Sequence, residues 1–165
     1  MVNKMIQSKI KTPLGDMIAI ADDHTLHLLE FTDRKNIDTQ LKKFGDVASG
    51  RNKIIESIEN ELGEYFAGNL KNFKTPLHIN GTDFQQSVLN VLNTIPYAET
   101  RSYKQQADIL NNPKAVRAIA SANGRNQIAI VIPCHRVIGS DGSLTGYAGG
   151  LDRKEWLLNH ERKYA

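Results

Sequence analysis

The chain has 165 residues, of which 40% are hydrophobic and 24% charged, a composition that suits one compact domain or two small ones. Its N-terminal stretch has no long apolar run, so we expect neither a signal peptide nor a membrane span. A single cysteine excludes an internal disulfide and a multi-cysteine zinc site. We therefore expect a cytoplasmic protein without a metal site.

The excess of positive charge lies entirely in the second half of the chain. Residues 1–79 carry 11 Lys and Arg against 11 Asp and Glu, whereas residues 80–165 carry 10 against 7. Within residues 100–136, Asp108 is the one acid among six basic residues. A local charge of this sign suits a nucleic-acid phosphate backbone, although many such clusters are solvated faces without a partner.

The first half of the chain is predicted to form a β-meander followed by helices. Segments 5–12, 17–21 and 25–31 are short and apolar or alternating, and turn residues separate them. Apolar residues spaced by three and four then predict helices over 36–44 and 52–68.

A domain boundary is predicted near residue 80. The segment that contains Pro76 and Gly81 has the composition of a linker or an edge strand. We therefore expect an N-terminal α/β structural domain over residues 1–79 and a second domain over residues 80–165.

The second half begins with two predicted helices whose starts carry capping residues. The first helix covers residues 84–95, with Thr82 or Asp83 as its N-cap. The next helix starts after Ser102, because Gln105 stands at the capping-box position.

A third helix, a strand and a C-terminal helix complete the predicted elements. Pro113 suits the first position of a helix over residues 114–123, which gives a helix-turn-helix with the helix before it. The β-branched segment 128–132 predicts a strand that leads to Cys134, and residues 153–161 predict a short helix.

The helix over residues 114–123 presents small side chains around one long one. Ala115, Ala118 and Ser121 give it a low profile, and Arg117 is its long central side chain. Such a helix can approach a narrow groove closely, and its solitary arginine can enter the base stack as a placeholder. The alternative is that the alanines pack in the core and Arg117 is an exposed, solubilising residue.

Cys134 raises the question of whether it is buried filler or a nucleophile. A free cysteine is most often a small buried hydrophobe. Here His135 and Arg136 follow it directly, and such neighbours favour the thiolate, which is the attacking form. Because successive side chains of an extended segment point to opposite faces, a turn or a bridging water must join thiol and imidazole. Glu161, one of few acids in this half, is the candidate carboxylate that orients His135.

The segment IPCHRVIGSDGSLTGYAGGLDRKEWLLNHE resembles the signature region of the O6-alkylguanine-DNA alkyltransferases. The resemblance extends upstream through YAETRSYKQQADILNNPKAVRAIASANGRN and covers most of residues 83–163. It implies an α+β fold, in which a small ribonuclease H-like antiparallel β-sheet with helices precedes a mostly helical, winged helix-turn-helix-like domain. That second domain is expected to carry both the DNA-binding surface and the active site.

The resemblance implies direct-reversal DNA repair without a cofactor. Such a protein binds the minor groove of double-stranded DNA, flips out O6-alkylguanine and moves the alkyl group irreversibly to its own cysteine. Cys134 is then the acceptor, His135 the base that acts through a water, Glu161 the residue that orients His135, and Asn126 a brace behind the site. O4-alkylthymine is a further expected substrate, and we expect a monomer that acts once and contacts no membrane.

The resemblance also assigns a DNA-binding surface and a pocket. Arg117 matches an arginine that fills the vacated stack, and Tyr103 matches a tyrosine that rotates the 3′ phosphate. The expected DNA-binding residues are Tyr103, Ala115, Arg117, Ala118, Ser121 and Arg136. The expected pocket residues are Val137, Tyr147, Ala148 and Gly149. Among these, the Val137 carbonyl and the Ala148 amide are expected to face the base.

Two positions depart from the family pattern, and three alternative functions are compatible with parts of the sequence. Gln127 replaces a common proline, and Ala148 replaces a serine found in some members. The alternatives are a lesion sensor without a cysteine, a Cys-His hydrolase that releases its covalent intermediate, and a winged-helix binder with an inert thiol. Cys134 argues against the first, and the lack of an evident second general base argues against the second.

Overall fold

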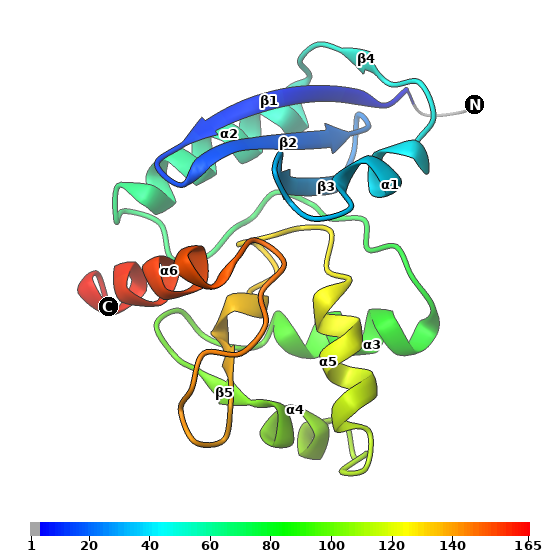
Figure 1. The fold of residues 1–165 in the computed structure, drawn as a ribbon. Helices are drawn as coiled ribbons and strands as arrows, with labels where there is room; N and C mark the ends of the chain where they lie inside the picture. Colours follow the sequence, from blue (N-terminus) through cyan, green and yellow to red (C-terminus); the bar gives the residue numbers. More distant parts are fainter. Residues whose placement is uncertain (1–3) are drawn as a thin grey trace. The chain divides into compact units, whose positions relative to one another are not determined.

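The computed structural model describes residues 4–165, and the chain divides into two compact units between residues 78 and 79 (Figure 1). The first unit contains β1 (Ile6–Thr12), β2 (Gly15–Ala21), β3 (Leu26–Phe31), α1 (Ile37–Lys42), β4 (Ala48–Ser49) and α2 (Lys53–Phe66). The second contains α3 (Asp83–Leu92), β5 (Arg101–Ser102), α4 (Tyr103–Ile109), α5 (Val116–Gly124), the 3-10 helix η1 (Cys134–Arg136), β6 (Val137–Ile138) and α6 (Leu151–Lys163). In the described part of the chain, every helix is too short or too polar to cross a bilayer.

The first unit is built on a four-stranded sheet with the order β3-β2-β1-β4. The three predicted strands are confirmed as an antiparallel meander, and β4 adds a short parallel pair with β1 that was not predicted. α2 packs against β1 and β2 (Figure 1). Its buried face includes Ile55, Ile58 and Leu62, which recur at spacings of three and four.

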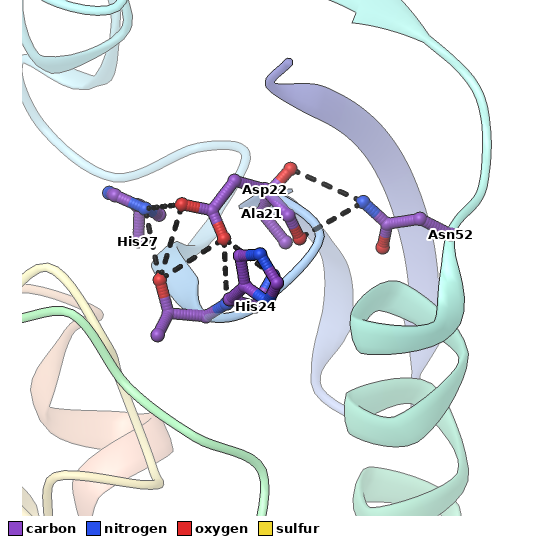
Figure 2. Close-up of polar contacts among 6 residues, drawn as sticks. Ala21, Asp22, His24, His27 and Asn52 are labelled. Carbon is purple, nitrogen blue, oxygen red and sulfur yellow. Dashed lines mark hydrogen bonds and ion pairs between the residues drawn. The ribbon is translucent and has the colours of Figure 1, made fainter. Parts of the chain in front are cut away.

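The predicted turn after β2 is held by Asp22 (Figure 2). Its Oδ1 accepts hydrogen bonds from the backbone N–H groups of His24 and Thr25, both at 2.7 Å. Its Oδ2 lies 2.9 Å from Nε2 of the buried His27. Burial alone raises the pKa of the Asp22 carboxyl, but these bonds hold it well below its usual range. Asn52, the N-cap of α2, donates to the Asp22 carbonyl at 3.2 Å and so ties the turn to α2.

In the second unit, α3, α4 and α5 pack around a small apolar core. Val88, Ala107, Ile119 and Ala122 are buried at its centre. α4 and α5 are the two helices of the predicted helix-turn-helix. β5 and β6 pair in parallel, which places the start of α4 beside the residues that follow Cys134.

Two helix starts agree with the sequence. Thr82 is the N-cap of α3 and Ser102 the N-cap of α4, and each hydroxyl accepts a bond from the N–H three residues on, at 3.1 Å. The side-chain oxygens of Gln85 and Gln105 accept a hydrogen bond from the backbone N–H of the N-cap residue, so both helices begin with a capping box.

The start of α5 differs from the prediction. The helix begins at Val116, so Pro113 lies in the preceding turn rather than at the first helical position. Asn111 has a φ of 56°, and the Asn112 carbonyl accepts a bond from the Ala115 N–H at 3.0 Å. Asparagine tolerates the left-handed region of backbone conformation. The turn therefore extends through residues 114 and 115, which were expected to form the first turn of the helix.

The predicted strand over residues 128–132 is wrong. The segment is a buried series of turns in which Ile130 has a φ of 71°. Asn126 closes it, because its Oδ1 accepts from the Ile128 N–H at 3.0 Å and its Nδ2 donates to the Ile132 carbonyl at 2.8 Å. A positive φ is unfavourable for a β-branched residue, so the bonds of Asn126 and the burial of the segment must stabilise it.

Candidate active site

A pocket of about 520 Å³ in the second unit contains the single cysteine in its wall. Its lining comes from α4, from α5, from η1 and from the loop before α6. These residues are Tyr103, Ala120, Asn123, Gly124, Cys134, Thr145, Gly146, Tyr147 and Ala148. A space of this size can hold a small organic group beside the thiol.

Cys134 is partly exposed in this pocket rather than buried as filler. It begins η1, so the turn that the sequence required between thiol and imidazole is present. The Cys134 N–H donates to the Ile132 carbonyl at 2.8 Å, and Asn126 Nδ2 lies 3.3 Å from Sγ. Asn126 therefore contacts the turn behind the cysteine.

His135 and Glu161 make the contact that the sequence suggested. His135 Nε2 lies 2.7 Å from Glu161 Oε2, and both side chains are fully buried. Arg136 binds the same carboxylate, with Nε 2.8 Å from Oε1 and Nη2 3.1 Å from Oε2. The backbone N–H of Ala98 also donates to Oε1, at 3.2 Å. Donors from three residues thus converge on one buried carboxylate.

These contacts set the protonation states of the site. Burial alone raises the pKa of the Glu161 carboxyl, but the bonds and charges of His135 and Arg136 hold it well below its usual range. Burial lowers the pKa of His135, and the Arg136 and Lys154 charges add to this, while Glu161 opposes it only in part.

His135 is therefore neutral at pH 7, with its proton on Nε2. An ionised carboxylate can only accept, so the nitrogen that faces Glu161 carries the hydrogen and Nδ1 carries the lone pair. Nδ1 is buried and has no hydrogen-bond partner among residues 4–165. This nitrogen can accept a proton from a nearby donor, as a general base requires.

Arg136, which was expected on the DNA-binding surface, is buried. Its side chain is 7% exposed. Besides Glu161, it bonds the Ile95 carbonyl through Nη1 at 2.7 Å, and its guanidinium lies 5.7 Å from the centre of the Tyr97 ring. A buried carboxylate needs strong donors to remain ionised, and Arg136 supplies two of them. We therefore assign Arg136 to the support of Glu161 rather than to a phosphate contact.

The expected pocket residues divide into two pairs. Tyr147 and Ala148 line the pocket, whereas Val137 is buried in β6 and Gly149 follows the lining segment, outside the described lining. Thr145, which was not predicted, donates to the Tyr103 hydroxyl at 3.2 Å and joins this loop to the start of α4.

Lys154 is a further candidate that was not predicted. Its side chain is fully buried, and its Nζ donates to the Thr145 carbonyl of the pocket loop at 2.6 Å. Burial lowers its pKa to about 8, while the nearby Cys134 opposes this in part. A signal was available in the sequence, because Lys154, Leu157 and Glu161 follow a helical spacing and share the buried face of α6.

The residues at and within α5 that were expected to face DNA differ in exposure. Arg117, Ala118 and Ser121 are exposed and lie within one face of the helix. Ala115 is half-buried and packs against the helical core instead. The exposed face therefore combines small side chains with one long cation, as the sequence predicts. Tyr103 lies at the pocket, at the start of α4.

Comparison with known proteins covers both units. Residues 5–79 match the ribonuclease-like domain of 6-O-methylguanine DNA methyltransferase, and residues 83–163 match its DNA binding domain. The methylated-DNA–protein-cysteine methyltransferase of Shigella flexneri is 43% identical over 164 residues, which cover 96% of each chain. That of Methanosarcina acetivorans is 43% identical over 158 residues, which cover 95% of this chain and 98% of the relative.

A solved structure agrees with these matches. Mycobacterium tuberculosis OGT, crystallised in complex with DNA, superposes with a TM-score of 0.88 at 39% identity, over 97% of this chain and 94% of that one. The likeness confirms the α+β fold with a ribonuclease-like first domain and a helical second domain. The chain therefore belongs to the family of methylated-DNA–protein-cysteine methyltransferases, which are DNA alkyltransferases of the direct-reversal repair type.

Proposed function

We propose that this chain repairs O6-alkylguanine in double-stranded DNA by moving the alkyl group to Cys134. The observation that carries the proposal is a partly exposed thiol in a pocket, followed in the chain by a neutral His135 that Glu161 orients. The same residues argue against an inert thiol, because packing alone does not require a buried histidine and carboxylate behind a cysteine. We assign residues 80–165 to DNA binding and chemistry, and residues 1–79 to a structural role.

The proposed reaction is a displacement at the alkyl carbon attached to O6. The thiol proton of Cys134 passes through one water to Nδ1 of His135, and the sulfur attacks the carbon. The C–S bond forms as the C–O6 bond breaks, and the electron pair of the broken bond goes to the guanine. The guanine takes up one proton, equivalent to the one that His135 accepted from the thiol, and remains in the DNA as the unmodified base. The thioether has no easy leaving route, so each molecule acts once.

DNA contact is assigned to the α4–α5 helix-turn-helix. The O6 atom of a stacked guanine cannot reach a pocket, so the base must leave the duplex. The face of Arg117, Ala118 and Ser121 suits close approach in the minor groove, with Arg117 filling the vacated place in the stack. We assign the turning of the 3′ phosphate to Tyr103, which lines the pocket and accepts a hydrogen bond from Thr145 of the pocket loop.

Two finer points follow from the same site. O4-alkylthymine carries a similar exocyclic alkyl ether, so we propose it as a second substrate. The thiol, the base and the helix-turn-helix all lie within one unit of one chain, so we propose that a monomer acts alone.

The transfer is tested by intact-protein mass spectrometry after incubation with a duplex that carries one O6-methylguanine. We expect a mass gain of one methylene, at no more than one equivalent, localised to Cys134 by peptide mapping. The Cys134→Ala variant should bind the lesion and gain no mass. Lesion binding by the wild type without a mass change would contradict the proposal and leave a sensor or a plain binder.

The proposed role of Arg117 is tested with and without the duplex. Arg117→Ala should slow transfer from the duplex by about 10- to 100-fold, since it loses a few kcal/mol of support for the flipped state. Transfer from the free base O6-methylguanine, which needs no flipping, should remain near the wild-type rate. Lys163→Ala removes one exposed cation from α6 and serves as the charge-matched control. An equal loss in both Arg117→Ala and Lys163→Ala would reduce Arg117 to a general phosphate contact.

A further inference from the structure

Two amide side chains are buried against each other between α4 and α5. Gln106 is fully buried and Asn123 is 7% exposed. Gln106 Nε2 donates to Asn123 Oδ1, and Asn123 Nδ2 donates to Gln106 Oε1, both at 2.9 Å. The pair lies beside an apolar core that includes Ala107 and Ala122, the chain neighbours of the two amides. It is therefore a polar element in a helix interface that is otherwise filled by hydrocarbon.

The reciprocal bonds fix the orientation of both amides. Each amide can donate two hydrogen bonds and accept two, and the pair uses one donor and one acceptor of each. Rotation of the Asn123 side chain would break both bonds inside a buried interface, which costs the desolvation of unsatisfied groups. Two apolar side chains could fill the same space without that cost. The two hydrogen bonds thus hold the Asn123 side chain in one orientation. One N–H and one oxygen lone pair of its amide are not used in the bonds to Gln106.

Asn123 also belongs to the wall of the pocket that holds Cys134. The other α5 residues in that wall, Ala120 and Gly124, have no polar side-chain atom. Across the described lining, the hydroxyls of Tyr103 and Thr145 are already bonded to each other at 3.2 Å. Asn123 therefore gives α5 a polar side chain of fixed orientation in the lining of the pocket that contains the acceptor thiol, where Tyr147 is a further polar residue.

We propose that Asn123, held by Gln106, is a specificity-determining residue that favours alkyl groups carrying a hydrogen-bonding atom. The inference rests on the proposed function, because it concerns which O6 substituent Cys134 receives. The favoured class is short substituents with a terminal hydroxyl, such as 2-hydroxyethyl, over hydrocarbon chains of equal length. A site built to bond a polar group discriminates strongly against the analogue that lacks it, because its own buried group is then left unpaired. Gln106 acts through Asn123 and is a positioning residue.

The first test uses the wild-type protein and two duplexes of matched size. One carries O6-(2-hydroxyethyl)guanine and the other O6-propylguanine, whose substituents have equal numbers of heavy atoms. The ratio of their transfer rate constants is compared with the ratio for a simple thiolate in solution. We expect the protein to prefer hydroxyethyl by about fivefold or more beyond the thiolate ratio, the effect of one neutral hydrogen bond. A protein ratio equal to the thiolate ratio would overturn the proposal, whether or not any variant folds.

The second test removes the amide pair. In Gln106→Leu/Asn123→Leu both amides are replaced together, so neither is left unsatisfied, and the rate ratio should fall to the thiolate value. Gln106→Leu alone should lower the ratio although Asn123 is intact, which a purely structural role of Gln106 would not do. Ile119→Val perturbs the same helix core outside the pocket lining and should keep the wild-type ratio. A wild-type ratio in the double variant would overturn the proposal.

A duplex with O6-methylguanine separates this proposal from the function on which it rests. Methyl transfer by the wild type with no preference for hydroxyethyl overturns the role of Asn123 alone. The absence of methyl transfer to Cys134 in the wild type overturns the proposed function and the selectivity with it.

Discussion

Two buried carboxylates, one in each unit, have pKa values that are shifted in opposite directions. Glu30 is the penultimate residue of β3 and binds Arg34, while Glu161 lies in α6 and binds Arg136. Burial raises the pKa of Glu30 to about 7, and the Arg34 charge and hydrogen bond offset this only in part. The pKa of Glu161 lies well below its usual range instead.

The number of hydrogen-bond donors explains the difference. Among residues 4–165, Arg34 is the only hydrogen-bond donor to Glu30, whereas Glu161 accepts from His135, from two nitrogens of Arg136 and from the Ala98 N–H. A nearby positive charge does not by itself keep a buried carboxylate ionised, but several directed donors do. The second unit thus keeps an ionised carboxylate next to His135, whereas the buried Glu30 of the first unit has a raised pKa.

The largest effect is expected when Glu161 loses its charge. Glu161→Gln leaves Arg136 buried without a counter-charge, which should lower the free energy of unfolding by about 3–5 kcal/mol. Methyl transfer should slow by about 100-fold or more, because His135 loses the group that fixes its tautomer. Glu155→Gln, on the exposed side of the same helix, is the control. Denaturant titration and single-turnover rates measure the two effects. A Glu161→Gln variant as active as the Glu155→Gln control would break the comparison.

Removing the hydrogen-bond donors of Arg136 should raise the pKa of Glu161, as burial raises the pKa of Glu30. Arg136→Met should destabilise the fold by about 3 kcal/mol and raise the pKa of Glu161. In the wild type, the stabilisation from Glu161 is present above its unfolded pKa of about 4.5 and is lost as the pH falls below it. In the variant the sign should reverse, so that this residue lowers stability as the pH rises through 4.5. Unfolding free energies from pH 3.5 to 6 decide the matter, and an unchanged slope contradicts the role assigned to the donors.

Lys154 offers a smaller test of charge at the thiol. Lys154→Met should slow methyl transfer at pH 7 by about tenfold, because a buried ammonium near Cys134 favours the thiolate. The wild-type lysine has a pKa of about 8, so its charge disappears at higher pH. The rates of variant and wild type should therefore converge above pH 9. A constant ratio from pH 7 to 9.5 would instead mean that Lys154 acts only by holding the Thr145 carbonyl.

The last test concerns Glu30, in the first unit. Its raised pKa means that its contribution favours the fold below about pH 4.5 and is lost as the pH rises to about 7. Glu30→Gln removes this dependence, so the stability of the variant relative to wild type should increase by about 1–3 kcal/mol between pH 5 and pH 8. Asp16→Asn in the same sheet, at a carboxyl that is not fully buried, is the matched control. A relative stability that stays level or falls over this range would show that Arg34 keeps Glu30 ionised.

Much of the fold could be predicted from local pattern. The three antiparallel strands are alternating or continuously apolar segments between turn residues. The capping boxes at Thr82 and Ser102 each depend on only four consecutive residues. The turns over residues 128–132 could not be predicted, because an apolar run is compatible with a strand and only the contacts of Asn126 exclude it. The two-residue β4 is likewise too short to leave a periodic signal.

The candidate site was predictable where chemistry limits the choices. Cys134 is the single thiol, His135 adjoins it, and few acids in the second half compete with Glu161. Burial of Arg136 was not apparent, because long cationic side chains are usually exposed and only the folded structure brings acceptors to them. The Gln106–Asn123 pair joins residues 17 positions apart on two helices, a contact that depends on how the helices pack.

The central claim is that burial keeps His135 neutral and that the ionised Glu161 holds the proton of the ring on Nε2, so that Nδ1 carries the lone pair. Nitrogen NMR of the protein labelled with ¹⁵N-histidine tests this directly, and a His135→Gln sample identifies the signals of His135. At pH 7 we expect the neutral Nε2–H tautomer, with protonation only below the ordinary histidine pKa of about 6.5. An imidazolium at pH 7, or a neutral ring with its proton on Nδ1, would contradict the account, because neither can accept the proton of Cys134.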